Sequence, residues 1–264
     1  MPLLADGEIW GIDRVDDSIA RLASLPDKCV DVVITDPPFS EHVHANMCSG
    51  TVLRKQKEGK LPRGVPKYES AFASFGDAQN AWIKDAIRVA KRWVVVHCGV
   101  EDFGKFELLV GRPEYVRGCI WHKRNSIGQL TADRPATAYE GITLFHAADV
   151  KKRWNGRGSY GIWTCNGTRG KKDRHPNEKP LDLCLKLVSL FSERGEIILD
   201  PFAGSAAIGE AAVRLGRMYS GWDNDANWVM RAGVRLSAAG GMEPVTDEHA
   251  LSLCRFDRTP AAYK

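Results

Sequence analysis

Two apolar runs that each end in an acidic residue and a proline turn constrain this chain more than any other feature. Residues 30–35 lead directly into Asp36-Pro37-Pro38-Phe39, and residues 197–199 lead into Asp200-Pro201-Phe202-Ala203-Gly204. In open α/β sheets, the loops beyond the carboxyl ends of the strands form the ligand crevice. Two such loops therefore predict two ligands that meet over one sheet, as they do in a two-substrate enzyme.

The order of the remaining elements predicts an α/β fold with a doubly wound, mostly parallel sheet. Apolar periodicity and turn residues place strands at 8–12, 30–35, 93–97, 197–199 and 218–222, and helices after residue 18, near 77–90, and at 179–194, 205–215 and 226–236. Two further strands at 117–122 and 141–146 flank a turn rich in Gly, Asn and Ser, which predicts an antiparallel edge.

The length of 264 residues and the 44% hydrophobic composition suit one large core, so we expect a single domain over residues 1–237 and a tail at 238–264. No stretch approaches the roughly 20 apolar residues that a bilayer span needs. The seven cysteines are scattered and are never spaced as a metal-binding or redox pair. We therefore expect a soluble, cytoplasmic protein.

No metal site is predicted. His42, His44 and Cys48 are close in sequence, but no fourth ligand has the expected spacing. His97 and Cys98 end a predicted strand, and we interpret them as a packed strand terminus rather than as a nucleophile.

Residues 197–225 form a strand, turn, helix and strand of the kind that holds an adenosine-containing cofactor. Gly204 lets the backbone approach a ligand closely, and the free N–H groups that open the next helix suit a carboxylate. Asp223 ends the second strand, where it can accept hydrogen bonds from both ribose hydroxyls. The turn lacks the glycine spacing of dinucleotide binders, so a nucleoside without a pyrophosphate fits best. The alternative is a tight turn with a structural role only.

The turn at residues 36–39 suits an aromatic amine as the second ligand. Each proline removes a backbone donor and keeps the preceding residue out of helical geometry, which leaves a stiff turn that offers acceptors. The Asp36 carboxylate and the Pro37 carbonyl can grip both N–H bonds of the amine, and Phe39 offers a flat face for its ring. The alternative is a turn that only terminates the strand.

The basic residues concentrate in two segments. Residues 151–174 carry eight basic side chains and one acidic one, and residues 54–67 carry six and one. Such a polarised surface suits a polyanion, although two solvated loops are the alternative. Trp154, Tyr160 and Trp163 are either anchors of a small subdomain or platforms for base stacking. The residues that we expect to contact the polyanion are Arg54, Lys55, Lys57, Lys151, Lys152, Arg153, Arg157, Arg169, Lys171 and Lys172.

At these motifs the chain resembles the DNA amino-methyltransferases, which transfer a methyl group from S-adenosylmethionine to the exocyclic amine of adenine or cytosine. Residues 36–39 match the family's motif of Asp, Asn or Ser followed by Pro-Pro-aromatic, and Phe202-Ala203-Gly204-Ser205-Ala206 approaches its Phe-x-Gly-x-Gly cofactor motif. The catalytic motif comes first, as in the circularly permuted β group. His175-Pro176-Asn177-Glu178-Lys179-Pro180 resembles the segment on the methionine side, and Gly11-Ile12-Asp13 resembles the strand end that approaches the adenine. The resemblance spans nearly all of residues 8–237.

The resemblance implies a Rossmann-like methyltransferase fold, double-stranded DNA as substrate and frequent pairing as a homodimer. It implies a base flipped out of the duplex and direct in-line transfer. Residues 149–175 fall where the family's target-recognition segment lies, and the basic loop at 54–67 is a second insertion. The implied catalytic residues are Asp36, Pro37, Pro38 and Phe39, and the implied cofactor contacts are Asp13, Asp36, Lys179, Asp200, Phe202, Ala203, Gly204, Ser205, Ala206, Asp223 and Asn224.

Two positions depart from the family pattern, since Ala206 replaces the second glycine and Phe39 stands where tyrosine is commoner. Aspartate at the first position of the catalytic motif favours adenine N6 by association within the family. The alternatives are cytosine N4 methylation, methylation of RNA or of a protein amide, and a DNA-binding protein that keeps the fold without turnover. The sequence leaves open the recognition site and a separate restriction endonuclease.

Overall fold

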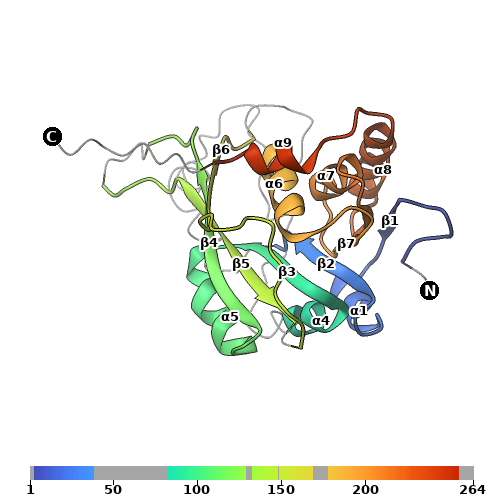
Figure 1. The fold of residues 1–264 in the computed structure, drawn as a ribbon, viewed down its shortest axis with the longest axis horizontal. Coiled ribbons are helices and arrows are strands. Elements are labelled where there is room, and N and C mark those ends of the chain that lie inside the picture. Colours follow the sequence, from blue (N-terminus) through green and yellow to red (C-terminus); the bar gives the residue numbers. More distant parts are fainter. Residues whose placement is uncertain (1–2, 39–81, 129–132, 148, 169–177, 256–264) are drawn as a thin grey trace, which may run out of the picture.

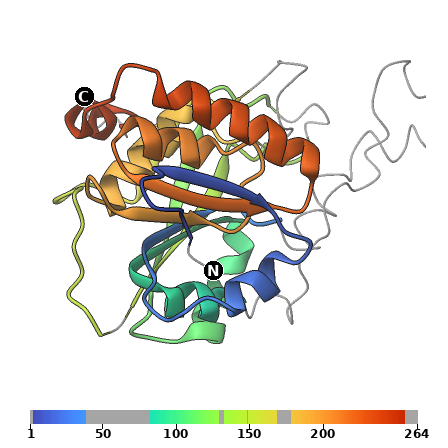
Figure 2. The same ribbon diagram turned by 90° about the vertical axis from the view of Figure 1, so that its right-hand side faces the viewer.

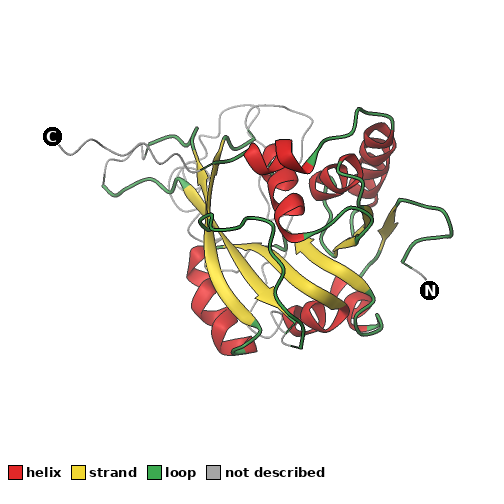
Figure 3. Cartoon of the chain, viewed as in Figure 1, coloured by secondary structure: helices red, strands yellow, loops and turns green. Residues whose placement is uncertain are grey.

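The chain is organised around one mixed sheet with helices on both faces (Figures 1 and 3). A computed structural model describes residues 3–38, 82–128, 133–147, 149–168 and 178–255. The strands are β1 (Trp10–Arg14), β2 (Val30–Thr35), β3 (Ala90–Cys98), β4 (Tyr115–Lys123), β5 (Tyr139–His146), β6 (Ile162–Cys165), β7 (Ile197–Asp200) and β8 (Met218–Asp223). The helices are α1 (Ser18–Ala23), α4 (Trp82–Val89), the 3-10 turn η2 (Val100–Asp102), α5 (Phe103–Val110), α6 (Leu181–Phe191), α7 (Ala207–Arg214), α8 (Ala226–Gly240) and α9 (Asp247–Ser252).

The strand order in the sheet is β1-β8-β7-β2-β3-β5-β4-β6. From β1 to β3, every neighbouring pair runs parallel. β5 pairs antiparallel with both β3 and β4, and β6 joins the far edge parallel to β4. The predicted α/β class, with its mostly parallel sheet and antiparallel region, is confirmed. The two proline turns follow β2 and β7, which are direct neighbours, so both turns lie at the same end of the sheet.

Two helical layers cover the sheet (Figure 2). α6, α7, α8 and α9 pack on one face, and α1, α4 and α5 pack on the other. Side chains alternate along β2, so that Val32 and Ile34 face α6 while Val33 faces the other layer. Because β2 is covered on both faces, its sequence is a nearly continuous apolar run.

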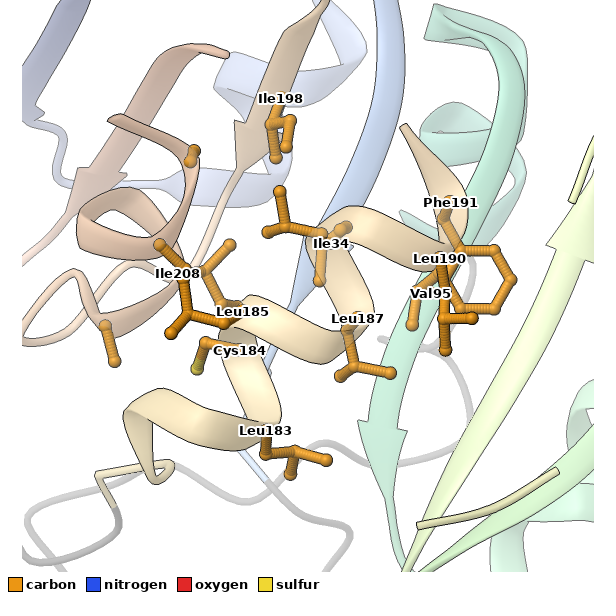
Figure 4. Packing of buried hydrophobic residues seen from close by; sticks show 14 of the residues in the cluster. Ile34, Val95, Leu183, Cys184, Leu185, Leu187, Leu190, Phe191, Ile198 and Ile208 are labelled. Carbon is orange, nitrogen blue, oxygen red and sulfur yellow. The ribbon is translucent and has the colours of Figure 1, made fainter. Parts of the chain in front are cut away.

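α6 lies over the centre of the sheet and is buried on all sides. Residues 183–191 are all buried, because the sheet covers one side of the helix and α7 and α9 pack against others. Figure 4 shows Ile34, Val95 and Ile198 of β2, β3 and β7 facing the side chains of α6. The sequence predicted one apolar face on α6, whereas the structure buries residues 183–191 on every side of the helix. The helix begins after Pro180, and this start places Lys179 at the carboxyl ends of β2 and β3.

Several elements differ from the sequence-based predictions. β1 spans Trp10–Arg14 rather than 8–12, and the short strand β6 lies inside a segment that shows no periodicity. The turn η2 and helix α5 were not predicted at all. The Phe103 ring, at the start of α5, packs on two glycines of the sheet. A Cβ at Gly118 of β4 or Gly141 of β5 would come within 3 Å of this ring, so these glycines are the trace that α5 leaves in the sequence.

The packed core continues beyond residue 237. α8 extends to Gly240, and α9 packs against α6. The fully buried guanidinium of Arg217 donates to both carboxylate oxygens of Asp247 in α9, at 2.9 and 2.8 Å. The boundary predicted at residue 237 therefore falls inside α8, and residues 238–255 belong to the packed unit.

The six cysteines within the described ranges are free thiols. In the same ranges, none of the helices has both the length and the apolar character that a membrane span requires.

Candidate active site

The catalytic turn predicted from sequence lies at the carboxyl end of β2. Pro37 is buried, and the side chain of Asp36 is 22% exposed. The ammonium group of Lys179, which is only 5% exposed, donates a hydrogen bond to Oδ2 of Asp36 at 2.6 Å. The structure thus brings together two residues that were predicted from separate motifs. Phe39 lies outside the described residues.

Three further polar residues share the sheet face of Asp36. Residues two positions apart on a strand point to the same face, and by this rule His97 of β3, Glu140 of β5 and Lys123 of β4 face the α6 layer. Nζ of Lys179 lies 3.5 Å from Oε2 of Glu140, and Nζ of Lys123 contacts Oε1 of the same carboxylate. Negative and positive groups therefore alternate in the order Asp36, Lys179, Glu140, Lys123. We call these four residues the charge row.

Burial and neighbouring charges set the protonation of the charge row. Burial raises the pKa of Asp36 against the opposing effect of Lys179, and the Glu140 carboxylate adds to the rise. Burial also acts to raise the pKa of Glu140, but Lys179 and Lys123 together lower it to about 2. Burial opposes the charge on Lys179, yet Asp36 and Glu140 raise its pKa, so it stays an ammonium. Burial and the two lysines lower the pKa of His97 to about 3, which keeps its imidazole neutral.

Asp200 begins the turn at residues 200–206, which we call the cofactor turn, and its side chain stabilises this turn. Its side chain is buried, and Oδ1 accepts hydrogen bonds from the Thr35 hydroxyl at 2.7 Å and from the Phe202 amide at 3.2 Å. Burial raises the pKa of Asp200 to about 7. The predicted direct contact between Asp200 and the cofactor is therefore not what the structure favours, because only 1% of the residue is exposed. Asp200 instead ties the cofactor turn to β2.

Gly204 and Asp223 hold the cofactor turn in shape. The Gly204 amide donates to Oδ2 of Asp223 at 2.9 Å, and the Asp225 amide donates to Oδ1 at 2.9 Å. Gly204 has φ +49°, and Ala206 has φ +54°. Both angles lie in the left-handed region, which glycine adopts at least cost. Ala206, which replaces the second glycine of the family motif, therefore adopts a backbone conformation that glycine would adopt at lower cost.

The residues present fit an adenosine-type cofactor that ends in a carboxylate. Asp13 of β1 pairs in register with Trp222 of β8, the residue before Asp223, so the end of β1 lies beside the strand end that carries Asp223 and Asn224. Asp13 and Asn224 are exposed, and each oxygen of Asp223 keeps a lone pair for a hydroxyl. The first turn of α7 has no side-chain cap, so its N–H groups suit an anion.

A second polar network connects this turn with the segment that precedes α6. Oε2 of Glu178 accepts a hydrogen bond from the Ser205 hydroxyl at 2.8 Å and lies 3.1 Å from Nη1 of Arg235. Nε of Arg235, in α8, donates to Glu210 of α7 at 2.6 Å. Sequence reasoning gave Glu178 no role beyond its place in the segment on the methionine side, and it gave Arg235 none. It also missed Lys123 at the end of β4 and Glu140 at the start of β5, because neither residue stands in a recognisable motif.

The first half of the second basic segment lies at the opposite end of the sheet from Asp36. Arg153 pairs with Glu196 at 2.8 Å, and Glu196 directly precedes β7. The chain therefore passes along the amino ends of the parallel strands before β6 returns toward the site. The structure does not bring the exposed residues Lys151, Lys152 and Arg153 together with the catalytic turn.

The aromatic residues of this segment are mainly anchors. Trp163 is 2% exposed and belongs to the core on the α6 side. Trp154 packs on Phe191 with ring centroids 5.5 Å apart and donates to the carbonyl of Arg157 at 2.6 Å. Tyr160 is 46% exposed. Arg157, which was predicted to contact DNA, thus belongs to a loop held by the end of α6.

The remaining residues predicted to contact DNA lie outside the described ranges. The chain leaves these ranges after Thr168 and rejoins them at Glu178, and the Thr168 hydroxyl donates to the Glu178 carbonyl at 2.5 Å. Glu178 directly precedes Lys179, so the described residues on either side of 169–177 lie beside the charge row. The residues concerned are Arg54, Lys55, Lys57, Arg169, Lys171 and Lys172.

This fold and site define an α/β enzyme that binds an adenosine-type cofactor beside a proline turn built to grip a second ligand. A family model described as DNA methylase (N6_N4_Mtase) matches residues 30–232. The chain belongs to this family, and it is a DNA methyltransferase that uses S-adenosylmethionine.

Two curated relatives are similar over most of this chain. The type II methyltransferase M.HinfI of Haemophilus influenzae is 23% identical over 83% of this chain and 66% of its own length. The type II methyltransferase M2.DpnII of Streptococcus pneumoniae is 25% identical over 84% of this chain and 88% of its own length.

Solved structures share the fold. The M1.HpyAVI complex with S-adenosylmethionine has a TM-score of 0.60 at 21% identity and covers 86% of this chain and 98% of its own. The cytosine-N4-specific PvuII DNA methyltransferase has a TM-score of 0.63 at 13% identity, with 92% and 90% coverage. TTHA0409 of Thermus thermophilus, a putative DNA modification methylase complexed with S-adenosyl-L-methionine, has a TM-score of 0.58 at 19% identity, with 89% and 98% coverage.

Proposed function

We propose that this chain methylates the N6 amine of adenine in double-stranded DNA. The observation that carries the proposal is the position of Asp36. Its carboxylate is held through one oxygen by Lys179, at the carboxyl end of β2 and next to the cofactor turn that follows β7. Aspartate at this motif position accompanies adenine more often than cytosine among related enzymes.

Asp36 and the Pro37 carbonyl supply two acceptors for the two N–H bonds of an exocyclic amine. The lone pair of such an amine is delocalised into the ring, so the nitrogen is a poor nucleophile while it stays planar. Acceptors that grip both N–H bonds favour a pyramidal nitrogen and direct its lone pair. Phe39 supplies a stacking face, and the base must leave the duplex to reach this pocket.

S-adenosylmethionine, when bound, supplies an electrophilic methyl group on a sulfonium. The amine nitrogen would form the N–C bond as the S–C bond of the sulfonium breaks and leaves a neutral thioether, and the nitrogen would then lose one proton. Asp36 is placed to accept that proton, since burial raises the pKa of its carboxyl above the ordinary value. Asp13, Asp223 and Asn224 would hold the adenosine, and the amides that open α7 would hold the methionine carboxylate.

We assign the contacts to the DNA backbone to two basic stretches of the sequence, residues 54–57 and 169–174. Residues 169–174 carry four basic side chains and one acidic side chain, and the described structure on both sides of this stretch lies at the Asp36 end. Residues 54–57 follow the catalytic turn in the chain and form the second contact. The proposed surface leaves out Lys151, Lys152 and Arg153, because Arg153 pairs with Glu196 at the opposite end of the sheet.

The test of the proposal is the identity of the methylated base. Unmethylated duplex DNA is incubated with the protein and labelled S-adenosylmethionine, digested to nucleosides and separated by mass. We expect label in N6-methyldeoxyadenosine. Label in N4-methyldeoxycytidine would support the second candidate, which the fold likeness to the cytosine-N4-specific enzyme favours. Preferential labelling of competing RNA would contradict both.

We further propose that the protein pairs as a homodimer, as members of the β group often do. α8 presents Met230 and Val234, which are 64% and 70% exposed and one helical turn apart. Light scattering at micromolar concentration should give twice the chain mass of 29.2 kDa. A single species of the chain mass would contradict pairing.

A further inference from the structure

Glu140 lies on the antiparallel strand β5, outside every motif of the cofactor and catalytic turns. Its side chain is only 12% exposed, which is unusual for a glutamate without a specific partner. Oε1 contacts Lys123, and Oε2 forms an ion pair with Lys179 at 3.5 Å without a hydrogen bond. Lys179 in turn contacts Asp36 at 2.6 Å. The Lys179 ammonium therefore bridges the Glu140 carboxylate and the Asp36 carboxylate, which is the group proposed to grip the amine.

The charge row is neutral as a whole, and this balance depends on Glu140. A buried ammonium costs free energy unless it is paired, and Lys179 is shared between two carboxylates. Without Glu140, Lys179 would have Asp36 as its main counterion, and Lys123 would lose its partner. The neutral imidazole of His97 lies on the same sheet face and adds no charge.

We propose that Glu140 is a positioning residue for methyl transfer, which holds Lys179 so that this lysine fixes Oδ2 of Asp36 and leaves Oδ1 for the amine. This inference rests on the proposed function of Asp36. Glu140 touches neither base nor cofactor in this role. It acts through Lys179, and Lys123 balances its charge from β4.

The proposal predicts that removing the charge of Glu140 and removing the charge of Lys123 shift the pKa of Asp36 in opposite directions. The groups that face Asp36 electrostatically are Lys179, Glu140 and Lys123, together with Asp200 of β7. Glu140 raises the pKa of Asp36 and Lys123 lowers it. Glu140→Gln should therefore shift the titration of Asp36 to lower pH, and Lys123→Met should shift it to higher pH. General loosening of the fold cannot produce shifts of opposite sign.

The experiment measures this titration in two ways. In the protein without cofactor, the carboxyl signal of Asp36 is followed by carbon NMR with labelled aspartate and assigned by its loss in Asp36→Asn. In single-turnover assays with duplex DNA and labelled S-adenosylmethionine, the acidic limb of the pH–rate profile is recorded. Both midpoints should move down in Glu140→Gln and up in Lys123→Met.

Glu196→Gln is the matched control. Glu196 is also a partly buried carboxylate, 17% exposed, and it also pairs with two cations, Arg92 and Arg153, but at the other end of the sheet. Its variant should leave both midpoints where they are in the unchanged protein. If Glu140→Gln does not fold, the upward shift in Lys123→Met still decides the question.

The inference is overturned if the NMR midpoint of Asp36 stays unchanged in both variants of the charge row, or if both variants move it in the same direction. These outcomes can be told apart from failure of the proposed function. If the proposed function fails, the unchanged protein gives no N6-methyldeoxyadenosine in DNA, while the NMR midpoints still report whether Glu140 controls the pKa of Asp36.

Discussion

The ammonium nitrogen of Lys179 lies 2.6 Å from Oδ2 of Asp36, although the two residues are 143 positions apart in the chain. This contact joins the turn after β2 to the segment that opens α6. It leaves one carboxylate oxygen for a ligand, and it places a fixed positive charge beside that ligand. The contact explains why two motifs distant in sequence act as one site.

Asp223→Ala should weaken binding of S-adenosylmethionine by about 1 to 3 kcal/mol, because the ribose hydroxyls lose their acceptor. Titration calorimetry measures the change. A 2′-deoxy analogue separates this loss from displacement of the Gly204 amide that Asp223 also holds. If Asp223 binds the ribose, removing the hydroxyl should weaken binding to the unchanged protein more than binding to Asp223→Ala. Equal penalties in both proteins would contradict the assignment.

Asp200→Asn should stabilise the protein more at pH 8 than at pH 5. Burial raises the pKa of Asp200 to about 7 in the folded chain, so its contribution to stability is full below the ordinary pKa near 4 and is lost as the pH rises through 7. Asparagine keeps the acceptor for Thr35 and removes the charge. The difference in unfolding free energy should grow by an amount on the order of 3 kcal/mol between the two pH values. The exposed pair partner Asp133 offers a control, since Asp133→Asn should give no such trend.

The two lysine pairs of the second basic segment provide a matched comparison. Lys171 and Lys172 fall in the sequence between Thr168 and Glu178, whose contact lies beside the charge row, whereas Lys151 and Lys152 precede the ion pair between Arg153 and Glu196 at the other end. Replacing Lys171 and Lys172 by alanine should flatten the salt dependence of DNA binding by about one slope unit per lost contact. The same change at Lys151 and Lys152 should leave the slope unchanged. An equal flattening of the slope in both variants would show that Lys151 and Lys152 also contact DNA.

Much of the fold was predictable because its central strands have strong local signals. The run that forms β2 and the βαβ unit from β7 to β8 combine apolar runs with turn residues, and their bounds were predicted to within two residues. α5 and β6 were missed because their signals lie elsewhere. α5 is positioned by its Phe103 ring, which packs on Gly118 of β4 and Gly141 of β5, and β6 has only four residues.

The site was predictable only where a motif carried it. Asp36, Lys179 and Asp223 stand in recognisable motifs, and the structure places them at one end of the sheet. Glu140 looks like an ordinary polar residue at the start of a strand, because its burial depends on pairing with β3 and β4 and on the arrival of Lys179. Arg153 was assigned to DNA from the charge of its segment and from the place of that segment in the family, and neither reveals that the chain runs past the far end of the sheet there.

Asp36 carries the proposed chemistry, and Asp36→Ala tests this role directly. A single-turnover assay measures methyl transfer to unmethylated duplex DNA, and calorimetry measures the Kd for S-adenosylmethionine of the same protein. We predict that transfer is abolished while the Kd stays within a few-fold of its original value, because Asp36 grips the amine rather than the cofactor. Transfer that continues at the original rate, or a loss of cofactor binding as large as the loss of transfer, would contradict the account.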